Sequence, residues 1–232
     1  MEPLEQEFNV HIENVTYESH GVTISSVLCY PKEKGMYPGI ITLHGIFGLQ
    51  EMDVRFPARL AGQGYVVLAH GWQSREKDPA DNDIVNDIKT AASFLKRQEM
   101  VNGDRLGLIG VCRGGSITMV TGAHSDDFKA LVSFYGQSYY PLKDEKKPVS
   151  PIELVDDLHA PILLIHGQRD TIFPWEESKD FCEALAKRNK VHECKFYPDA
   201  EHGFFLKGHR NYHEESAEDA WDLLGQFLRK NL

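Results

Sequence analysis

Residues 105–116 read Arg-Leu-Gly-Leu-Ile-Gly-Val-Cys-Arg-Gly-Gly-Ser, and this stretch decides the fold. Its apolar run, residues 106–111, predicts a short buried strand, and the residues from Ser116 onward begin like a helix. Cys112 therefore lies where a strand turns sharply into a helix. A turn this tight strains its central residue and leaves room only for residues without a Cβ, which here are Gly110, Gly114 and Gly115.

This spacing is the nucleophile-elbow pattern, G-x-nucleophile-x-G, with cysteine in the position where serine is usual. The N-terminus of the following helix points its dipole and free N–H groups at the cysteine, which favours the thiolate. We predict that Cys112 is a nucleophile. The alternative is a buried cysteine that only fills a tight turn.

Strand and helix patterns alternate along the rest of the chain. An antiparallel hairpin is predicted over residues 9–30, and buried strands are predicted at 39–43, 65–69, 130–135, 161–167 and 191–197. Amphipathic helices are predicted at 52–61, 83–98, 175–188 and 212–228. This alternation favours a mostly parallel sheet with helices on both faces, in a single domain over residues 1–232. Residues 137–160 form a long polar loop, which we expect to contribute to a pocket lid.

Two further strand ends carry residues that suit catalysis with Cys112. Asp170 follows the strand at 161–167, and His202 follows the strand at 191–197. The order nucleophile, acid, histidine is that of the α/β-hydrolase fold, whose active site lies at the carboxyl ends of the strands. In this arrangement His202 takes the thiol proton and Asp170 orients its ring. Singly, Asp170 could be a helix cap and His202 an ordinary loop histidine.

The first loop after a buried strand, His44-Gly45-Ile46-Phe47-Gly48, suits an oxyanion hole. Such a hole needs the N–H after the nucleophile, which is that of Arg113, and one N–H from this loop. We predict the second donor to be Ile46, because the flanking glycines let the backbone bend. The alternative is that this loop is only a tight turn.

The chain resembles the dienelactone hydrolase family of α/β-hydrolases over most of its length. The resemblance is carried by residues 110–115, Ile46-Phe47-Gly48, Phe134-Tyr135-Gly136, residues 167–170 and His202-Gly203-Phe204. The cysteine at the elbow is its most specific part. The resemblance implies hydrolysis of a lactone or ester through an acyl-cysteine, with no cofactor.

The sequence departs from well-known family members in two places. Those members carry a glutamate where this chain has Gly45, and an arginine four residues after the histidine, where this chain has Leu206 followed by Lys207. Arg75 lies near the place of a second substrate-binding arginine. Aromatic residues near the predicted strand ends favour an apolar or aromatic substrate. The predicted substrate contacts are Phe47, Trp72, Tyr135, Trp175 and Phe204.

Composition limits the partners and the compartment. The net charge of −10 argues against nucleic acid and anionic membranes as partners. The four cysteines, Cys29, Cys112, Cys182 and Cys194, are widely spaced, so we expect neither a disulfide framework nor a metal site. Residues 1–8 are acidic and lack the apolar segment of a signal peptide. We therefore expect a cytoplasmic monomer or homodimer.

The predicted function is hydrolysis of a small carboxylic ester or lactone by Cys112, His202 and Asp170. Two alternatives stay open. One is a hydrolase of short peptides or acyl-aminoacyl substrates, since related folds cut peptides. The other is a non-catalytic protein that binds a ligand or senses oxidants through a low-pKa Cys112 thiol.

Overall fold

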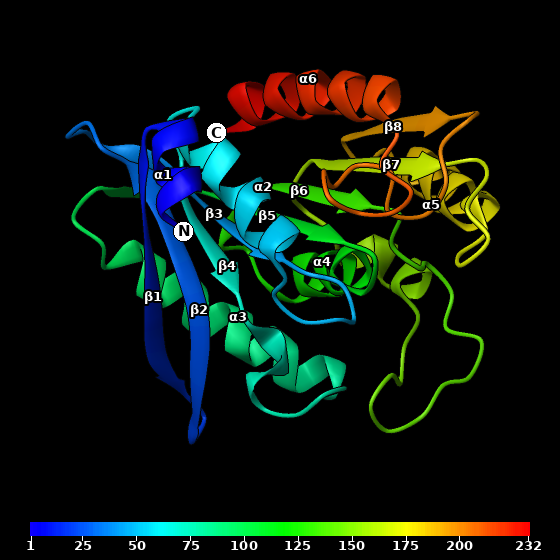
Figure 1. The fold of residues 1–232 in the computed structure, drawn as a ribbon. Helices are drawn as coiled ribbons and strands as arrows, with labels where there is room; N and C mark the ends of the chain where they lie inside the picture. The colour runs from blue at the N-terminus through cyan, green and yellow to red at the C-terminus, as the bar shows by residue number, and fades with distance from the viewer.

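The computed structural model describes residues 1–232 and is built around one eight-stranded sheet (Figure 1). The strands are β1 (Val10–Ser19), β2 (Val22–Pro31), β3 (Tyr37–Leu43), β4 (Val66–His70), β5 (Val101–Val111), β6 (Phe128–Phe134), β7 (Ile162–Gly167) and β8 (His192–Tyr197). Their order across the sheet is β1-β2-β4-β3-β5-β6-β7-β8. The β1–β2 and β2–β4 pairs are antiparallel, and all of the remaining pairs are parallel. The predicted α/β fold with a mostly parallel sheet is confirmed.

Helices cover both faces of this sheet, as Figure 1 shows. One apolar cluster joins the sheet to α1 (Glu2–Phe8), α2 (Glu51–Ala61) and α6 (Glu214–Asn231). A second cluster on the opposite face involves α3 (Asp81–Lys96), α4 (Arg113–His124) and α5 (Trp175–Lys187). Two short 3₁₀ helices, η1 (Trp72–Ser74) and η2 (Pro151–Asp157), complete the elements. None of the helices is both long and apolar enough to cross a bilayer.

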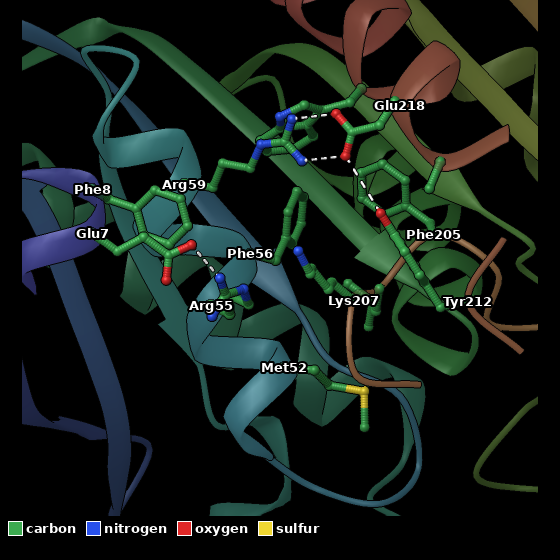
Figure 2. Close-up of a pocket in the computed structure, with 13 residues that line it drawn as sticks. Glu7, Phe8, Met52, Arg55, Phe56, Arg59, Phe205, Lys207, Tyr212 and Glu218 are labelled. Carbon is green, nitrogen blue, oxygen red and sulfur yellow. Dashed lines mark hydrogen bonds and ion pairs between the residues drawn. The ribbon is translucent and has the colours of Figure 1, made fainter. Parts of the chain in front are cut away.

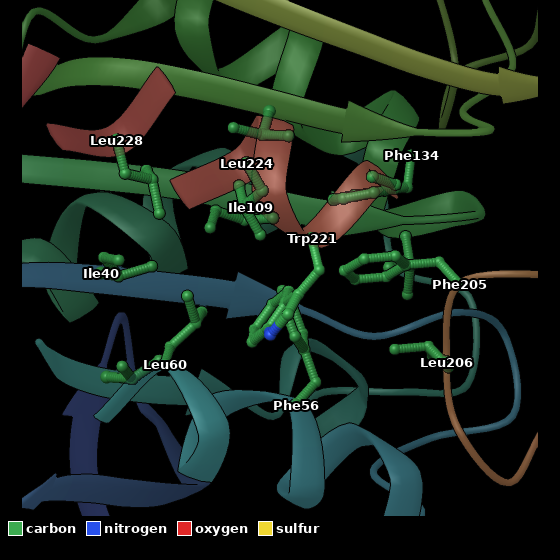
Figure 3. Packing of buried hydrophobic residues seen from close by; sticks show 14 of the residues in the cluster. Ile40, Phe56, Leu60, Ile109, Phe134, Phe205, Leu206, Trp221, Leu224 and Leu228 are labelled. Atoms are coloured by element: carbon green, nitrogen blue, oxygen red, sulfur yellow. The ribbon is translucent and has the colours of Figure 1, made fainter. Parts of the chain in front are cut away.

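The carboxyl-terminal halves of the central strands β3 and β5 are mainly apolar, and both of their faces are buried. Ile40 of β3 and Ile109 of β5 pack under the α6 residues Trp221 and Leu224 (Figure 3). Phe56 of α2 meets the Trp221 ring edge-on, with 5.5 Å between the ring centroids. β5 lies in the middle of the sheet, paired with β3 and β6, so its carboxyl end has neighbouring strand ends on both sides.

Three local features differ from the sequence expectations. β5 begins at Val101 rather than after Asp104, because Val101 and Asn102 already pair with β3 before a register shift. Residues 2–8, which carried no prediction of secondary structure, form the short helix α1. The segment 137–160 is not wholly irregular, since Ser150 and Glu153 form a capping box at the start of η2.

The cysteine prediction is wrong in one respect. Cys182 of α5 and Cys194 of β8 form a disulfide, with their Cα atoms 6.6 Å apart. The two residues are separated by 12 positions in sequence, and no CxxC pattern marks them. They meet because α5 packs back against the next strand, a tertiary contact that cysteine spacing does not encode. Cys29 and Cys112 remain free.

Candidate active site

Cys112 occupies the sharp turn between β5 and α4. Its backbone angles, φ 55° and ψ −122°, lie outside the regions that L-residues favour, so the turn is strained. The Cys112 N–H donates to the carbonyl oxygen of Phe134 at 3.0 Å, which ties the turn to β6. The glycines are required by close approach: a Cβ on Gly114 would lie 2.3 Å from the carbonyl oxygen of Leu43. A Cβ on Gly110 would lie 1.9 Å from the carbonyl oxygen of Gly114.

His202 and Asp170 meet at the neighbouring strand ends, as their chain order suggested. His202 Nδ1 lies 2.7 Å from Asp170 Oδ2. The Asp170 side chain is fully buried, while 12% of the His202 side chain is exposed. The geometry therefore leaves the His202 ring accessible from the pocket and its carboxylate partner shielded from water.

Four N–H groups hold the Asp170 carboxylate. Oδ1 accepts the backbone N–H groups of Ile172 at 2.8 Å and Phe173 at 2.9 Å. Oδ2 accepts one hydrogen bond from His202 Nδ1 and another from His166 Nε2, which lies 3.0 Å away. His166 is the residue before the last one of β7 and is buried. Its other ring nitrogen, Nδ1, lies 2.7 Å from the hydroxyl of Ser178. Sequence reasoning missed His166, although its place directly before Gly167 at a strand end was a usable signal.

The electrostatics of this pair follow from these contacts. Burial alone would raise the pKa of Asp170, but the hydrogen bonds from His166 and His202 outweigh it and hold that pKa well below its usual range. Burial would lower the pKa of His202, but the hydrogen bond to Asp170 and the adjacent Cys112 raise it to about 9. The His202 ring is thus set up to hold a proton beside the cysteine sulfur.

The predicted oxyanion donors lie on either side of the elbow. Arg113 is the first residue of α4, and the first N–H groups of a helix have no acceptor within it. The Ile46 N–H donates to no backbone acceptor in the protein. Trp72 is buried beneath this first loop, where its Nε1–H donates to the carbonyl oxygen of His44 at 3.0 Å. Trp72 therefore supports the loop rather than facing the pocket.

Cys112 and His202 open into a small pocket of about 70 Å³. Its lining includes five residues predicted from the sequence, which are Ile46, Phe47, Cys112, Tyr135 and His202. The other lining residues are Gly45, Gly48, Gln50, Met52, Asp53, Val111, Gly203, Leu206 and His209. The buried Tyr135 hydroxyl has no hydrogen-bond partner in the protein. Since drug-sized ligands occupy sites of about 300–1,000 Å³, this pocket suits a small group.

Three predicted contacts lie away from this pocket. Trp72 supports the first loop, Phe204 is fully buried between Tyr135 and Tyr197, and Trp175 packs on Phe196 of β8. Aromatic residues near strand ends could not be separated by sequence into core and pocket, because both places favour the same side chains. None of residues 137–160 is among the residues that line this pocket.

Arg113 explains where the segment 137–160 goes instead. Its guanidinium donates to the hydroxyl of Tyr140 at 2.7 Å and to the carboxylate of Asp81 at 2.5 Å. The Asp81 N–H in turn donates to the carbonyl oxygen of Lys146 at 2.8 Å. These contacts hold the segment against the start of α3.

A larger groove of about 250 Å³ lies on the other side of Met52 and Leu206, which line both cavities. Figure 2 shows Arg59 facing Glu218 and Arg55 facing Glu7 along this groove. The groove contains no cysteine and no histidine. We place the candidate chemistry in the smaller pocket, because that pocket alone of the two contains Cys112 and His202. No cluster of three or more histidine, cysteine or acidic residues could hold a metal ion.

The sheet order, the elbow after β5 and the acid and histidine at later strand ends are those of the α/β-hydrolase class. A solved structure titled "Crystal Structure of Putative Dienelactone Hydrolase from Klebsiella pneumoniae subsp. pneumoniae MGH 78578" superposes with a TM-score of 0.89 at 28% identity, covering 95% of this chain and 98% of that one. The model of the dienelactone hydrolase family matches residues 24–232. The chain belongs to the dienelactone hydrolase family.

Two relatives extend the comparison at the level of sequence. A Yersinia pestis protein named "Putative carboxymethylenebutenolidase" is 32% identical, with 93% of this chain and 87% of the relative covered. A Bradyrhizobium protein named "Probable 2-oxo-3-(5-oxofuran-2-ylidene)propanoate lactonase" is 28% identical, with 92% of each chain covered. The alignments therefore span nearly the whole length of both relatives.

Proposed function

We propose that this chain hydrolyses a lactone or a small carboxylic ester through an acyl-cysteine formed on Cys112. The observation that carries the proposal is the shared pocket of Cys112 and His202, with His202 bonded to the buried Asp170. The relatives support the same reaction class, since one is named as a carboxymethylenebutenolidase and another as a lactonase. The size of the pocket favours a small acyl group.

In the first half of the reaction, the Cys112 sulfur attacks the substrate carbonyl carbon while His202 holds the thiol proton. The carbonyl oxygen gains negative charge, and the N–H groups of Ile46 and Arg113 donate to it. The carbon–oxygen bond to the leaving group then breaks, and His202 returns its proton to that oxygen. With a lactone, the alcohol produced stays attached to the acyl chain.

In the second half, His202 takes a proton from water, and the resulting oxygen nucleophile attacks the thioester carbon. The carbon–sulfur bond breaks, the carboxylic product leaves, and the proton on His202 goes back to the sulfur. Asp170 keeps the His202 ring in the orientation that both halves require. The strained turn keeps the Cys112 sulfur at the N-terminus of α4 during both halves of the reaction.

The test is a screen of para-nitrophenyl esters and simple lactones with wild type and Cys112→Ala. We expect turnover by wild type, loss of at least 10³-fold in Cys112→Ala, and an acylated Cys112 peptide in mass spectra of quenched wild type. Circular dichroism of both proteins controls for folding. Equal activity of the two proteins would overturn the proposal. Absent turnover with rapid peroxide oxidation of Cys112 would favour the thiol-sensor alternative.

A further inference from the structure

Asp53 gives the candidate pocket a carboxylate that nothing in the proposed reaction uses. It lies in the first turn of α2, lines the same pocket as Cys112, and is 9% exposed. Its Oδ2 accepts the backbone N–H of Gln50 at 3.0 Å, as part of a capping box. The cap fixes the position of this side chain at the wall of the pocket.

No lysine or arginine side chain compensates this carboxylate within the pocket. Arg75 pairs with Asp87 at 2.9 Å, and Arg113 pairs with Asp81. Lys207 lines the larger groove instead, as Figure 2 shows. These three basic side chains therefore do not pair with Asp53.

The histidines of the pocket do not neutralise the negative charge of Asp53 either. His202 is already paired with Asp170. Burial lowers the pKa of His209, so its ring is mainly neutral at and above neutral pH. Burial raises the pKa of Asp53 to about 6, against the lowering effect of the Gln50 N–H, so its carboxylate is ionised at pH 8.

We propose that Asp53 is a specificity-determining residue that makes this pocket accept neutral lactones and esters and reject substrates whose acyl group carries a carboxylate. The inference rests on the proposed function. It separates this chain from the Bradyrhizobium relative, whose name describes a propanoate and therefore an anionic substrate. Like charges brought together in a partly desolvated pocket repel more strongly than they do in water.

The primary test compares the alkylation of Cys112 by iodoacetamide and by iodoacetate at pH 8. These reagents have nearly the same size and differ by one negative charge, and both are small enough for the pocket. We expect Asp53→Asn to raise the iodoacetate-to-iodoacetamide rate ratio at Cys112 about tenfold, which corresponds to about 1.4 kcal/mol. Peptide mass spectrometry follows Cys112 separately from the buried Cys29.

Glu51→Gln is the matched control, because Glu51 is an exposed residue of the same helical turn and does not line the pocket. Its rate ratio should equal that of wild type. An unchanged ratio in Asp53→Asn, or an equal increase in Glu51→Gln, would overturn the inference. Asparagine can still accept the Gln50 N–H, so the helix cap is retained.

A second measurement uses the hydrolysis of para-nitrophenyl pentanoate and mono-para-nitrophenyl glutarate, with the Cys112→Ala background subtracted. Wild type should favour the pentanoate in kcat/KM, and Asp53→Asn should reduce that preference about tenfold, by about 1.4 kcal/mol. A failure of the proposed function can be told apart from a failure of the Asp53 inference. Lack of turnover of both esters would count against the proposed function, while the alkylation ratio tests Asp53 without requiring turnover.

Discussion

At the scale of single residues, the His202 ring determines how the candidate site responds to pH. Its pKa lies above its ordinary value because the hydrogen bond to Asp170 and the neighbouring Cys112 outweigh the effect of burial. Since this pKa is raised to about 9, the ring holds a proton at neutral pH and loses it as the pH rises through that value. The stability that this proton contributes is complete below the ordinary pKa of about 6.5 and is lost toward pH 9.

We predict that His202→Ala slows alkylation of Cys112 by iodoacetamide at pH 7 about tenfold, because the positive charge beside the sulfur is removed. The alkylation profile should also move to more alkaline pH. Peptide mass spectrometry of both proteins from pH 5 to 10 gives the two curves. Coincident curves would mean that His202 does not activate Cys112, and the proposed mechanism would be untenable.

The residues of the site differ in how far the sequence reveals them. Cys112, Asp170 and His202 could be placed together because a glycine-flanked elbow and a fixed chain order are local signals. Asp53 could not, because an acidic residue in the first turn of a helix is an ordinary cap, and only the tertiary fold turns it toward the pocket. Trp72 was misplaced for the converse reason, since a buried tryptophan under a loop has the same sequence signature as one in a binding site.

At the scale of elements, the β5–α4 turn tolerates no side chain at Gly114. A Cβ there would lie 2.3 Å from the carbonyl oxygen of Leu43, which is a backbone atom at the end of β3 and not the flexible end of a side chain. We predict that Gly114→Ala lowers the midpoint of urea unfolding by an amount equivalent to at least about 2 kcal/mol, with loss of activity. Gly225→Ala in α6 is the control.

The control substitution should be neutral or stabilising. A Cβ on Gly225 would meet only the flexible end of Arg229, at 3.1 Å, and alanine is the better helix former. If Gly114→Ala unfolded at the same urea concentration as wild type and kept full activity, the close packing of the elbow would be refuted.

The disulfide between α5 and β8 leads to a second prediction at the scale of elements. Closing a loop of this length between Cys182 and Cys194 restricts the unfolded chain and contributes up to about 3 kcal/mol. Cys182→Ser, Cys194→Ser and the double variant should therefore unfold at equally reduced urea concentrations, and dithiothreitol should reproduce the loss in wild type. Non-reducing peptide mapping that finds both thiols free would contradict the bond.

At the scale of the whole molecule, the periodicity of the sequence carries most of the architecture. Continuous apolar runs between amphipathic helices are found in buried parallel strands, so the sheet and its helix layers could be predicted. The meeting of α5 with β8 could not, because it brings together Cys182 and Cys194, which no local pattern pairs. Nor could the path of residues 137–150, which depends on the contacts of Arg113 with Tyr140 and Asp81. Local pattern does not encode these pairings.

Trp221 tests how much of this architecture depends on the α6 layer. Trp221 is 5% exposed, and its ring packs against Phe56 and Phe205 (Figure 3). The Arg59 guanidinium lies over the same ring, 4.3 Å from its centroid. We predict that Trp221→Ala lowers the free energy of unfolding by about 3–5 kcal/mol, while Trp221→Phe costs clearly less. Urea unfolding measures both. Equal, small effects of the two variants would show that α6 adds little to the core.

The four hydrogen bonds on Asp170 have a consequence for the isotopic behaviour of turnover. They hold the pKa of Asp170 well below its usual range against the opposing effect of burial, so a proton shared between the two side chains stays on His202. In the transition state of each chemical step, a single proton should then be transferred, between His202 and the reacting oxygen or sulfur. In mixtures of H₂O and D₂O, the rate should fall in a straight line with the deuterium fraction, whereas a curved plot would mean that a second proton moves.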